Sequence, residues 1–324
     1  MGVSTVNKID GNFKNKDILS IDQFSPKDLE ILFRVTKQMK AIAVSAAPSD
    51  ILKGNIVTLI FYEPSSRTFG SFAAAVKQLG GQTVEIQDPQ HFSSVSKGET
   101  LEDTIRVFEA YCDAIVIRHP VKGTAQQAAD AAFFVPIVNA GDGIGEHPTQ
   151  ALLDMFTIYE KKPKFEGLIG VMAGDMLNGR TVHSLIRALS LYKNVTLYLL
   201  SPEELKLSRE DFKNFQAKGI KLIEIDSDKD MPKNADFWYW TRVQKERFAT
   251  LEEYEKVKNK FVVTTKLIKE KAGKDTLILH PLPRVGEIET AVDADPRAVY
   301  LRSEIRSGMY VRMALLALIL GKIK

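Results

Sequence analysis

Two serines, an arginine and a threonine follow one another where a predicted strand turns into a predicted helix. In the segment FYEPSSRT, residues 61–68, they are Ser65, Ser66, Arg67 and Thr68. Unpaired backbone N–H groups and the positive end of the helix dipole attract an anion to such a position. An arginine can add a bidentate contact to the oxygens of that anion. The segment therefore predicts an anion site, with a plain N-cap, which needs only one of these side chains, as the alternative.

A histidine and a glutamine lie at the start of a second predicted helix, in the segment GDGIGEHPTQALLD. They are His147 and Gln150, with Pro148 in the first helical turn, where proline is tolerated. The helix dipole disfavours a charged imidazole here, so we expect a neutral His147 that can donate a hydrogen bond to a carbonyl. A capping histidine that meets no substrate is the alternative. The predicted buried face of the helix consists of Ala151, Leu152, Met155, Phe156 and Tyr159.

The segment GDMLNGRT contains Arg180 and suggests a rival interpretation of the protein as a nucleotide hydrolase. Its spacing of Gly174, Gly179 and Arg180 is one residue from a phosphate-binding P-loop whose lysine is replaced by arginine. A nucleotide hydrolase would also need a carboxylate that binds Mg²⁺ after another strand. The segment KLIEID, residues 221–226, is a loose candidate for that carboxylate. A surface arginine in the first turn of a helix is the third interpretation of Arg180.

Two further loops follow strand-like segments. Arg242 and Gln244, in FWYWTRVQKERF, point the same way if the aromatic strand continues, whereas QKER alone would be a solvated run of charges. In LILHPLPRVGEI, the carbonyls of Pro281 and Leu282 can accept hydrogen bonds from an amide NH₂. A tight proline turn is the alternative for that segment.

Lys97 lies in the segment FSSVSKGETLEDTI. In the same segment Ser96 and Glu99 have the spacing of a capping box, in which the two side chains satisfy backbone N–H groups at the start of a helix. The pattern by itself favours the capping box over a role for Lys97 in binding.

Taken together, these groups describe an anion site, a neutral group that polarises a carbonyl, carbonyl acceptors for an NH₂, and two arginines for carboxylates. Carbamoyl phosphate with an acidic amino acid has these features, and many other metabolites have some of them. The pattern narrows the substrate class without identifying the substrate.

The elements that must position these groups alternate between strand-like and helix-like runs, which predicts an α/β protein with parallel sheets. The predicted strands are 56–62, 114–118, 135–139, 168–173, 195–200, 221–225, 237–240 and 276–279. A domain boundary is expected near residues 147–167, and a last helix over about 308–320 could pack back on the first domain.

Composition excludes several classes of protein. The 324 residues correspond to roughly two domains, and the net charge of +3, from 44 basic and 41 acidic side chains, does not indicate nucleic-acid binding. The single cysteine, Cys112, excludes an intramolecular disulfide and a Cys-rich metal site and is typical of the reducing cytosol. We expect no signal peptide and no membrane span, since the apolar run 313–320 is far shorter than the roughly 20 residues required.

Seven segments, in this order along the chain, resemble the motifs of the aspartate carbamoyltransferase catalytic chain. They are FYEPSSRT, SSVSKGETLEDT, RHP, NAGDGIGEHPTQALLD, GDMLNGRTVHSL, TRVQKERF and HPLPRVGEI. The resemblance extends from about residue 55 to the C-terminus. It implies transfer of a carbamoyl group from carbamoyl phosphate to L-aspartate in de novo pyrimidine biosynthesis, without a cofactor or metal.

The resemblance also implies an architecture. Two doubly wound parallel-sheet α/β domains are expected, joined by interdomain helices. Residues 1–148 with about 307–324 would bind carbamoyl phosphate, and residues 149–306 would bind aspartate. A cytoplasmic homotrimer is implied, with active sites shared between subunits, no nucleic acid and no membrane. Partnership with a regulatory chain or with other pathway enzymes stays open.

Roles for individual residues follow from the resemblance. The residues implied to bind carbamoyl phosphate are Ser65, Ser66, Arg67, Thr68, Arg118, His147 and Gln150, with the carbonyls of Pro281 and Leu282. Arg118 would contact both the phosphate and the carbamoyl group, Thr68 and His147 would polarise the carbonyl, and Gln150 would help hold the NH₂. The residues implied to bind the two carboxylates of aspartate are Arg180, Arg242 and Gln244.

Ser93 and Lys97 match the loop that, in the family, reaches into the active site of a neighbouring subunit. This replaces the capping-box interpretation of the segment. The implied catalytic residues are Arg67, Thr68, Lys97, Arg118 and His147. The Leu282–Pro283 bond is expected to be cis, because the family's turn uses it to aim two carbonyls at one NH₂.

Departures from the family pattern are few. Ser66 stands where Thr is usual, and Phe69 and Ala73 replace a frequent Arg and Glu pair, so both partners of an i,i+4 pair are changed together. An ornithine carbamoyltransferase is the nearest rival, but its pattern has a Cys-containing segment in place of HPLP. A catalytically silent relative is the rival from another class, and the intact Arg67, His147 and Lys97 argue against it.

Overall fold

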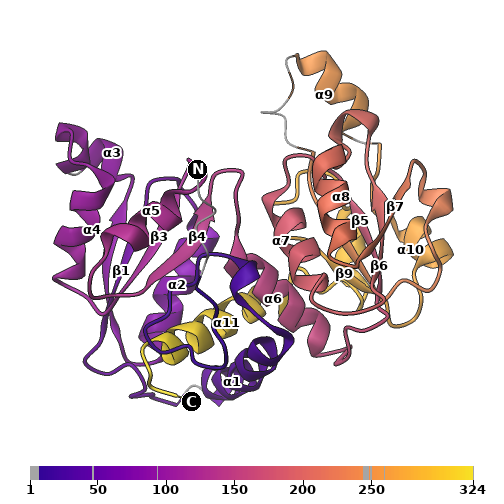
Figure 1. Cartoon of the computed structure of the whole chain (residues 1–324). Coiled ribbons are helices and arrows are strands. Elements are labelled where there is room, and N and C mark those ends of the chain that lie inside the picture. The colour runs from indigo at the N-terminus through magenta and orange to yellow at the C-terminus, as the bar shows by residue number, and fades with distance from the viewer. Residues whose placement is uncertain are drawn as a thin grey trace. The chain divides into compact units, whose positions relative to one another are not determined.

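The computed structural model describes residues 7–45, 47–92, 94–243, 248, 250–258 and 260–323. The chain divides into two compact units. The first unit lies within residues 1–153 and 306–324, and the second unit lies within residues 154–305. Each unit contains a parallel β-sheet flanked by helices (Figure 1). This confirms the predicted fold class.

The sheet of the first unit has the strand order β2-β1-β3-β4, and every pair of neighbours is parallel. Its central strands β1 and β3 are almost entirely buried because a parallel sheet is covered by helices on both faces. The strands are β1 (Ile56–Phe61), β2 (Gln82–Gln87), β3 (Ala114–His119) and β4 (Ile137–Asp142). The helices are α1 (Pro26–Ser45), α2 (Ser66–Gln78), α3 (Pro89–Phe92), α4 (Leu101–Glu109) and α5 (Thr124–Ala131), with 3-10 helices η1 (Ile21–Gln23) and η2 (Ser94–Lys97).

The sheet of the second unit has the strand order β7-β6-β5-β8-β9, again parallel throughout. The strands are β5 (Ile169–Ala173), β6 (Thr196–Leu200), β7 (Lys221–Ile225), β8 (Phe237–Trp240) and β9 (Leu277–Leu279). The helices are α7 (Arg180–Leu189), α8 (Arg209–Ala217), α9 (Leu251–Val257) and α10 (Thr265–Lys271), with 3-10 helices η3 (Glu203–Leu205), η4 (Asp228–Asp230) and η6 (Thr290–Ala294).

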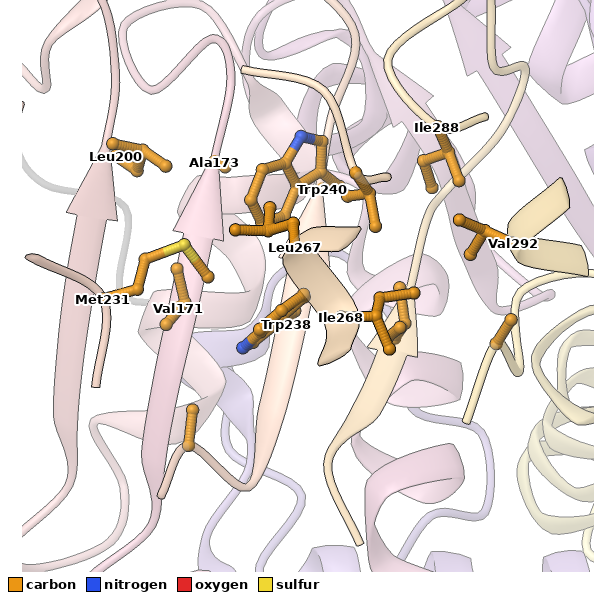
Figure 2. Close-up of a cluster of buried hydrophobic side chains, with 14 of the residues drawn as sticks. Val171, Ala173, Leu200, Met231, Trp238, Trp240, Leu267, Ile268, Ile288 and Val292 are labelled. Carbon is orange, nitrogen blue, oxygen red and sulfur yellow. The ribbon is translucent and has the colours of Figure 1, made fainter. Parts of the chain in front are cut away.

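An aromatic core packs against one face of the second sheet. Trp238 and Trp240 extend from β8 on the same side, with ring centroids 5.8 Å apart, and Leu267 and Ile268 of α10 lie over them (Figure 2). The indole N–H of Trp240 is satisfied by the carbonyl of Phe261 at 3.1 Å. This core fixes the end of β8, after which the predicted aspartate-binding segment begins.

Two helices continue from one unit into the other along the chain. They are α6 (Pro148–Tyr159) and α11 (Ser303–Ile319). Pro148 opens α6, as predicted. The predicted buried face of α6 is confirmed for Ala151, Leu152, Met155 and Phe156, but Tyr159 is only half-buried, and burial extends beyond that face to Leu153 and Ile158. The buried residues of α6 include the polar Thr149 and Asp154, each of which needs a partner.

The predicted strands all occur, with small differences at their ends. β7 and β8 have the predicted bounds, while β4 begins two residues later than expected and continues to Asp142. The sequence analysis missed β2, an edge strand of sequence QTVEIQ whose side chains are exposed or half-buried. An edge strand lacks the apolar signature of a central strand, because only one side of it is paired. In the part of the chain that the structure describes, no helix is both long and apolar enough to cross a membrane.

Candidate active site

The predicted anion loop lies between β1 and α2 in the first unit. Ser65 occupies the N-cap position of α2, with extended backbone at φ −159°, but its side chain makes no capping hydrogen bond. The plain N-cap interpretation is therefore wrong for Ser65. Ser66 and Arg67 are exposed in the first turn of α2, and Thr68 is buried. The first N–H groups of the helix and these side chains form the kind of site that binds an anion.

Arg118 lies beside this loop, at the end of the neighbouring strand β3. Phe61 of β1 pairs with Arg118 in the parallel register, and the backbone N–H of Tyr62 donates to the Arg118 carbonyl at 2.8 Å. The buried guanidinium donates to the carbonyl of Ala140 at 3.2 Å and pairs with the carboxylate of Glu63 at 2.9 Å. These contacts hold Arg118 at the carboxyl edge of the sheet.

The loop that carries His147 wraps around a buried carboxylate. Asp142, at the end of β4, accepts hydrogen bonds from the backbone N–H groups of Gly123 at 2.8 Å and Glu146 at 2.7 Å. A Cβ at Gly145 would stand 2.5 Å from Asp142 Oδ1, so any side chain there would displace this carboxylate. The Glu146 carboxylate in turn accepts from the Ser20 hydroxyl at 2.6 Å.

His147 itself is only 4% exposed and lies directly before the first residue of α6. Its carbonyl accepts from the N–H groups of Gln150 and Ala151 at 3.0 and 3.2 Å, as at a helix N-terminus. The Thr149 hydroxyl lies 3.5 Å from His147 Nδ1. The loops after β1, β3 and β4 thus bring the predicted anion loop, Arg118, His147 and Gln150 to one edge of one sheet. That edge, at the carboxyl ends of the strands, is where open parallel sheets bind ligands.

In the second unit, two predicted arginines follow neighbouring strands. Arg180 is the first residue of α7, after β5, and Arg242 lies two residues beyond the end of β8. β5 and β8 pair through Ala173 and Trp240, so both arginines follow the same edge of the sheet. The strand does not continue to Arg242, contrary to the condition under which Arg242 and Gln244 would point the same way. Gln244 lies outside the described residues.

The geometry of the β5–α7 loop does not fit the rival P-loop interpretation. A carboxylate faces the loop, since Asp175 Oδ1 accepts from the Asn178 N–H at 2.8 Å. The candidate magnesium ligand, Asp226, follows β7, which lies two strands from β5, or about 10 Å away. Asp226 pairs there with Lys206 at 3.0 Å. No group of three or more His, Cys, Asp or Glu side chains suited to a metal occurs among the described residues.

The loop after β9 is held by buried polar groups. His280 Nδ1 accepts from the Leu282 N–H at 2.8 Å, so its Nε2 carries the proton that is donated to Glu287 Oε1 at 2.6 Å. Glu287 also accepts from the Val285 N–H at 2.8 Å. Burial would raise the pKa of Glu287, but the hydrogen bonds from His280 and Val285 outweigh it and lower the pKa. The Leu282–Pro283 bond is cis, which confirms that prediction.

The segment around Lys97 differs from the capping-box prediction. Lys97 is the exposed last residue of η2, and Ser93 lies outside the described residues. The N-cap of the following helix, α4, is Thr100, whose hydroxyl accepts from the Asp103 N–H at 3.1 Å. Glu99 accepts instead from the Thr104 hydroxyl at 2.9 Å. The capping box between Ser96 and Glu99 is therefore wrong, because Thr100 offers a better-placed cap.

Sequence reasoning overlooked several polar residues around these loops. They are Glu63, Ser71, Thr149, Glu304 and Arg312. A polar residue inside an apolar periodic run is the signal that could have pointed to Thr149 and Arg312, since a buried polar group needs a partner. The partners themselves are far away in sequence, and nothing in the local pattern indicates them.

Comparisons with known proteins place the chain in a family. The model described as "Aspartate/ornithine carbamoyltransferase, carbamoyl-P binding domain" matches residues 16–160, and "Aspartate/ornithine carbamoyltransferase, Asp/Orn binding domain" matches residues 166–319. The match begins well before the first segment in which the sequence shows the resemblance.

Individual relatives agree with the family models. The aspartate carbamoyltransferase catalytic subunit of Leptospira biflexa is 47% identical over 309 residues, which cover 95% of this chain and 98% of that protein. The multifunctional protein pyr1-3 of Dictyostelium discoideum is 45% identical over 96% of this chain, which spans 14% of that longer protein. The structure of Trypanosoma cruzi aspartate transcarbamoylase in complex with carbamoyl phosphate and aspartate has a TM-score of 0.87 and 37% identity, covering 97% of this chain and 99% of that one. This chain therefore belongs to the aspartate/ornithine carbamoyltransferase family, among its aspartate carbamoyltransferases.

Proposed function

We propose that this chain transfers the carbamoyl group of carbamoyl phosphate to the α-amino group of L-aspartate, giving N-carbamoyl-L-aspartate and phosphate. The observation that carries the proposal is the relative from Trypanosoma cruzi, whose structure holds both carbamoyl phosphate and aspartate and which matches 97% of this chain at 37% identity. The reaction uses no cofactor and no metal. Its product belongs to de novo pyrimidine biosynthesis.

Carbamoyl phosphate is assigned to the first unit. The phosphate would bind Ser65, Ser66, Arg67 and Thr68 at the N-terminus of α2. This assignment is supported by the Ser65 hydroxyl, which is not used as a helix cap. Arg118 would bridge the phosphate and the carbamoyl oxygen, and the neutral imidazole of His147 would donate to that oxygen. Gln150 and the carbonyls of Pro281 and Leu282 would hold the NH₂.

Aspartate is assigned to Arg180, Arg242 and Gln244, which would bind its two carboxylates. Its uncharged amino group attacks the carbamoyl carbon, the C–N bond forms, and the bond from that carbon to the phosphate oxygen breaks. Thr68, Arg118 and His147 would stabilise the negative oxygen of the tetrahedral intermediate. None of the assigned residues is an evident general base, so the departing phosphate is proposed to take the proton of the amine. Most of the acceleration would come from positioning two anions together.

The proposal extends to the assembly. A homotrimer is expected, in which Ser93 and Lys97 of one subunit complete the site of its neighbour. The exposed position of Lys97 at the end of η2 is compatible with that role. We further propose a cytoplasmic enzyme. Partnership with a regulatory chain or other pathway enzymes is left open.

Phosphate release from carbamoyl phosphate, measured with aspartate and with ornithine in parallel, tests the assignment. Aspartate should be carbamoylated and ornithine should not. The two arginines, Arg180 and Arg242, suit the two carboxylates of aspartate, whereas ornithine has an amine in place of the second carboxylate. Comparable rates with the two amino acids would contradict the proposal. Hydrolysis of a nucleotide that requires magnesium would instead revive the P-loop interpretation.

A further inference from the structure

A buried arginine near the C-terminus links the two segments of the first unit that are assigned to carbamoyl phosphate. Arg312 of α11 is 4% exposed. Its Nη1 donates to the Ser71 hydroxyl at 2.8 Å, and its Nη2 donates to the Thr149 hydroxyl at 3.3 Å. Its guanidinium carbon lies 4.9 Å from the centroid of the Phe72 ring. One side chain therefore contacts both α2 and α6.

A chain of hydrogen bonds connects Arg312 through α2 to the anion loop. The Ser71 hydroxyl accepts from Arg312 and donates to the carbonyl of Thr68 at 3.0 Å. Thr68 is the last residue of the SSRT sequence and lies in the first turn of α2. A shift of Ser71 would therefore move the helical turn that presents Arg67 and Thr68.

On the side of α6, the contacts of Arg312 lead through Thr149 to His147. The fully buried Thr149 hydroxyl accepts from Arg312 and lies 3.5 Å from His147 Nδ1. A hydroxyl that accepts from arginine has its own proton left to donate, and Nδ1 is the ring nitrogen that faces it. When the Thr149 hydroxyl donates to Nδ1, the imidazole proton is on Nε2, and this tautomer can donate to a carbonyl.

Helix packing alone does not explain an arginine at this place. Arg312 has the buried apolar residues Val311 and Met313 on either side of it in α11. Removal of a guanidinium from water is costly, and an apolar side chain of similar length would fill the same space without that cost. Gly308, one turn earlier, leaves room for it, because a Cβ there would stand 2.8 Å from Arg312 Nη1.

We propose that Arg312 is a positioning residue. It holds the anion loop at the start of α2 and His147 at the start of α6 in fixed positions relative to each other. Carbamoyl phosphate then meets its phosphate-binding and carbonyl-polarising groups together. The inference rests on the proposed function, since it concerns the site assigned to carbamoyl phosphate. Arg312 acts through Ser71 and Thr149.

The test replaces the guanidinium by an apolar side chain of similar length, Arg312→Met, in the full-length protein. Its thermal midpoint should stay within a few degrees of the wild type. Its kcat should fall about 10- to 100-fold, because small displacements of reacting groups are that costly, and its KM for carbamoyl phosphate should rise about tenfold. Leu315→Ala, at a fully buried position of the same helix, is the matched control. It should lower the midpoint and leave the kinetic constants of the folded enzyme near those of the wild type.

Two further variants keep Arg312, and each removes one of the two hydroxyl groups to which it donates. Ser71→Ala should mainly raise the KM for carbamoyl phosphate. Thr149→Val should mainly lower kcat and change the pH profile of kcat, since it releases His147 Nδ1. If Arg312→Met does not fold, these two variants decide the question. Kinetic constants equal to those of the wild type in all of the folded variants would overturn the inference, as would losses that follow only the loss of stability seen in Leu315→Ala.

Binding of inorganic phosphate, measured by calorimetry, separates this inference from the proposed function. The anion site should bind phosphate without any aspartate, and Arg312→Met should weaken that binding about tenfold. An inactive wild type would contradict the proposed function, and the phosphate measurement would still test Arg312. Equal phosphate affinity in the wild type and Arg312→Met would overturn the role of Arg312 even if the enzyme is active.

Discussion

We assign Arg284 and Arg242 different roles because they occupy different places in the fold. Arg284 donates from both Nη atoms to the carboxylate of Asp293, at 2.5 and 2.6 Å, and this carboxylate raises the pKa of the arginine. It joins two segments of the second unit. Arg242 instead lies half-buried beyond the carboxyl end of β8, on the edge of the sheet where ligands bind. The position of each arginine in the fold, and not its residue type, therefore separates the structural role of Arg284 from the proposed binding role of Arg242.

Replacement of Arg242 by alanine tests its assignment. A charge-assisted hydrogen bond to a carboxylate contributes roughly 1.5–3 kcal/mol, which corresponds to about 10- to 100-fold in affinity. Arg242→Ala should therefore raise the KM for aspartate by about that factor and leave the binding of carbamoyl phosphate, measured by calorimetry, little changed. The control is Arg209→Ala, at an exposed arginine of α8 that pairs with Glu224. Equal losses for the two substrates would contradict the role.

At the scale of elements, the loop of residues 280–287 is fixed by side chains that are distant in sequence. His280 and Glu287 form a hydrogen bond with both side chains almost fully buried. Glu304, in the first turn of α11, accepts from the His280 N–H at 3.0 Å. The shape of the loop, and with it the direction of the Pro281 and Leu282 carbonyls, depends on these two carboxylates.

Glu304 meets a second buried carboxyl group, Asp154 of α6. Burial, the charge of Asp154 and a hydrogen bond with Asp154 raise the pKa of Glu304 well above its ordinary value. Two carboxyl groups can share a hydrogen bond only when one of them holds a proton. The Tyr239 hydroxyl faces the same pair from β8, and burial and the charge of Asp154 raise its pKa too.

This pair predicts a pH dependence of stability. Because the pKa of Glu304 is higher in the folded than in the unfolded state, its contribution is fully present below about pH 4.5, the ordinary pKa of glutamate. It is lost as pH rises toward the folded-state pKa. Glu304→Gln keeps an acceptor for the His280 N–H and adds a donor to Asp154. Relative to wild type, this variant should therefore gain stability as the pH rises from 5 to 8.

Thermal unfolding of the wild type and Glu304→Gln at both pH values measures the difference. Each relative gain of about 1 kcal/mol corresponds to about 2–4 °C in the midpoint for a unit of this size. Comparison of the two proteins at each pH cancels the contributions of all other titrating groups. An identical pH dependence would mean that Glu304 is not the group that holds the proton.

At the scale of the whole molecule, the proposed trimer predicts complementation between two inactive variants. Lys97→Ala and His147→Ala should each be nearly inactive, because one lacks a charge supplied across the interface and the other lacks the carbonyl-polarising group. After subunit exchange, each mixed trimer has a single interface at which an intact Lys97 meets an intact His147. Activity should rise toward about one third of the wild-type value per mixed trimer.

Mass spectrometry of intact assemblies establishes that exchange has taken place. A mixture of two preparations of the same variant is the control and should stay inactive. If mixed trimers form and activity stays flat, each chain holds its whole site, and the assignment of Lys97 to a neighbouring subunit is wrong.

The sequence by itself determined the alternation of strands and helices, and it indicated the segments to which we assign the chemistry. The predicted strands occur near their expected positions, and Pro148 opens α6. These features depend on periodicity, helix-end chemistry and proline geometry, which are properties of neighbouring residues. The family resemblance added the cis bond before Pro283, which spacing does not reveal.

Only the tertiary structure decided which polar groups meet. It placed the cap of α4 on Thr100, and it paired β2 at the edge of the first sheet. It also brought Arg312 to Ser71, 241 residues away, and to Thr149, 163 residues away. Hydrogen bonds of this kind depend on burial and on the crossing of helices in space. A local pattern records that a residue is polar, but its partner is set by how the whole chain excludes water.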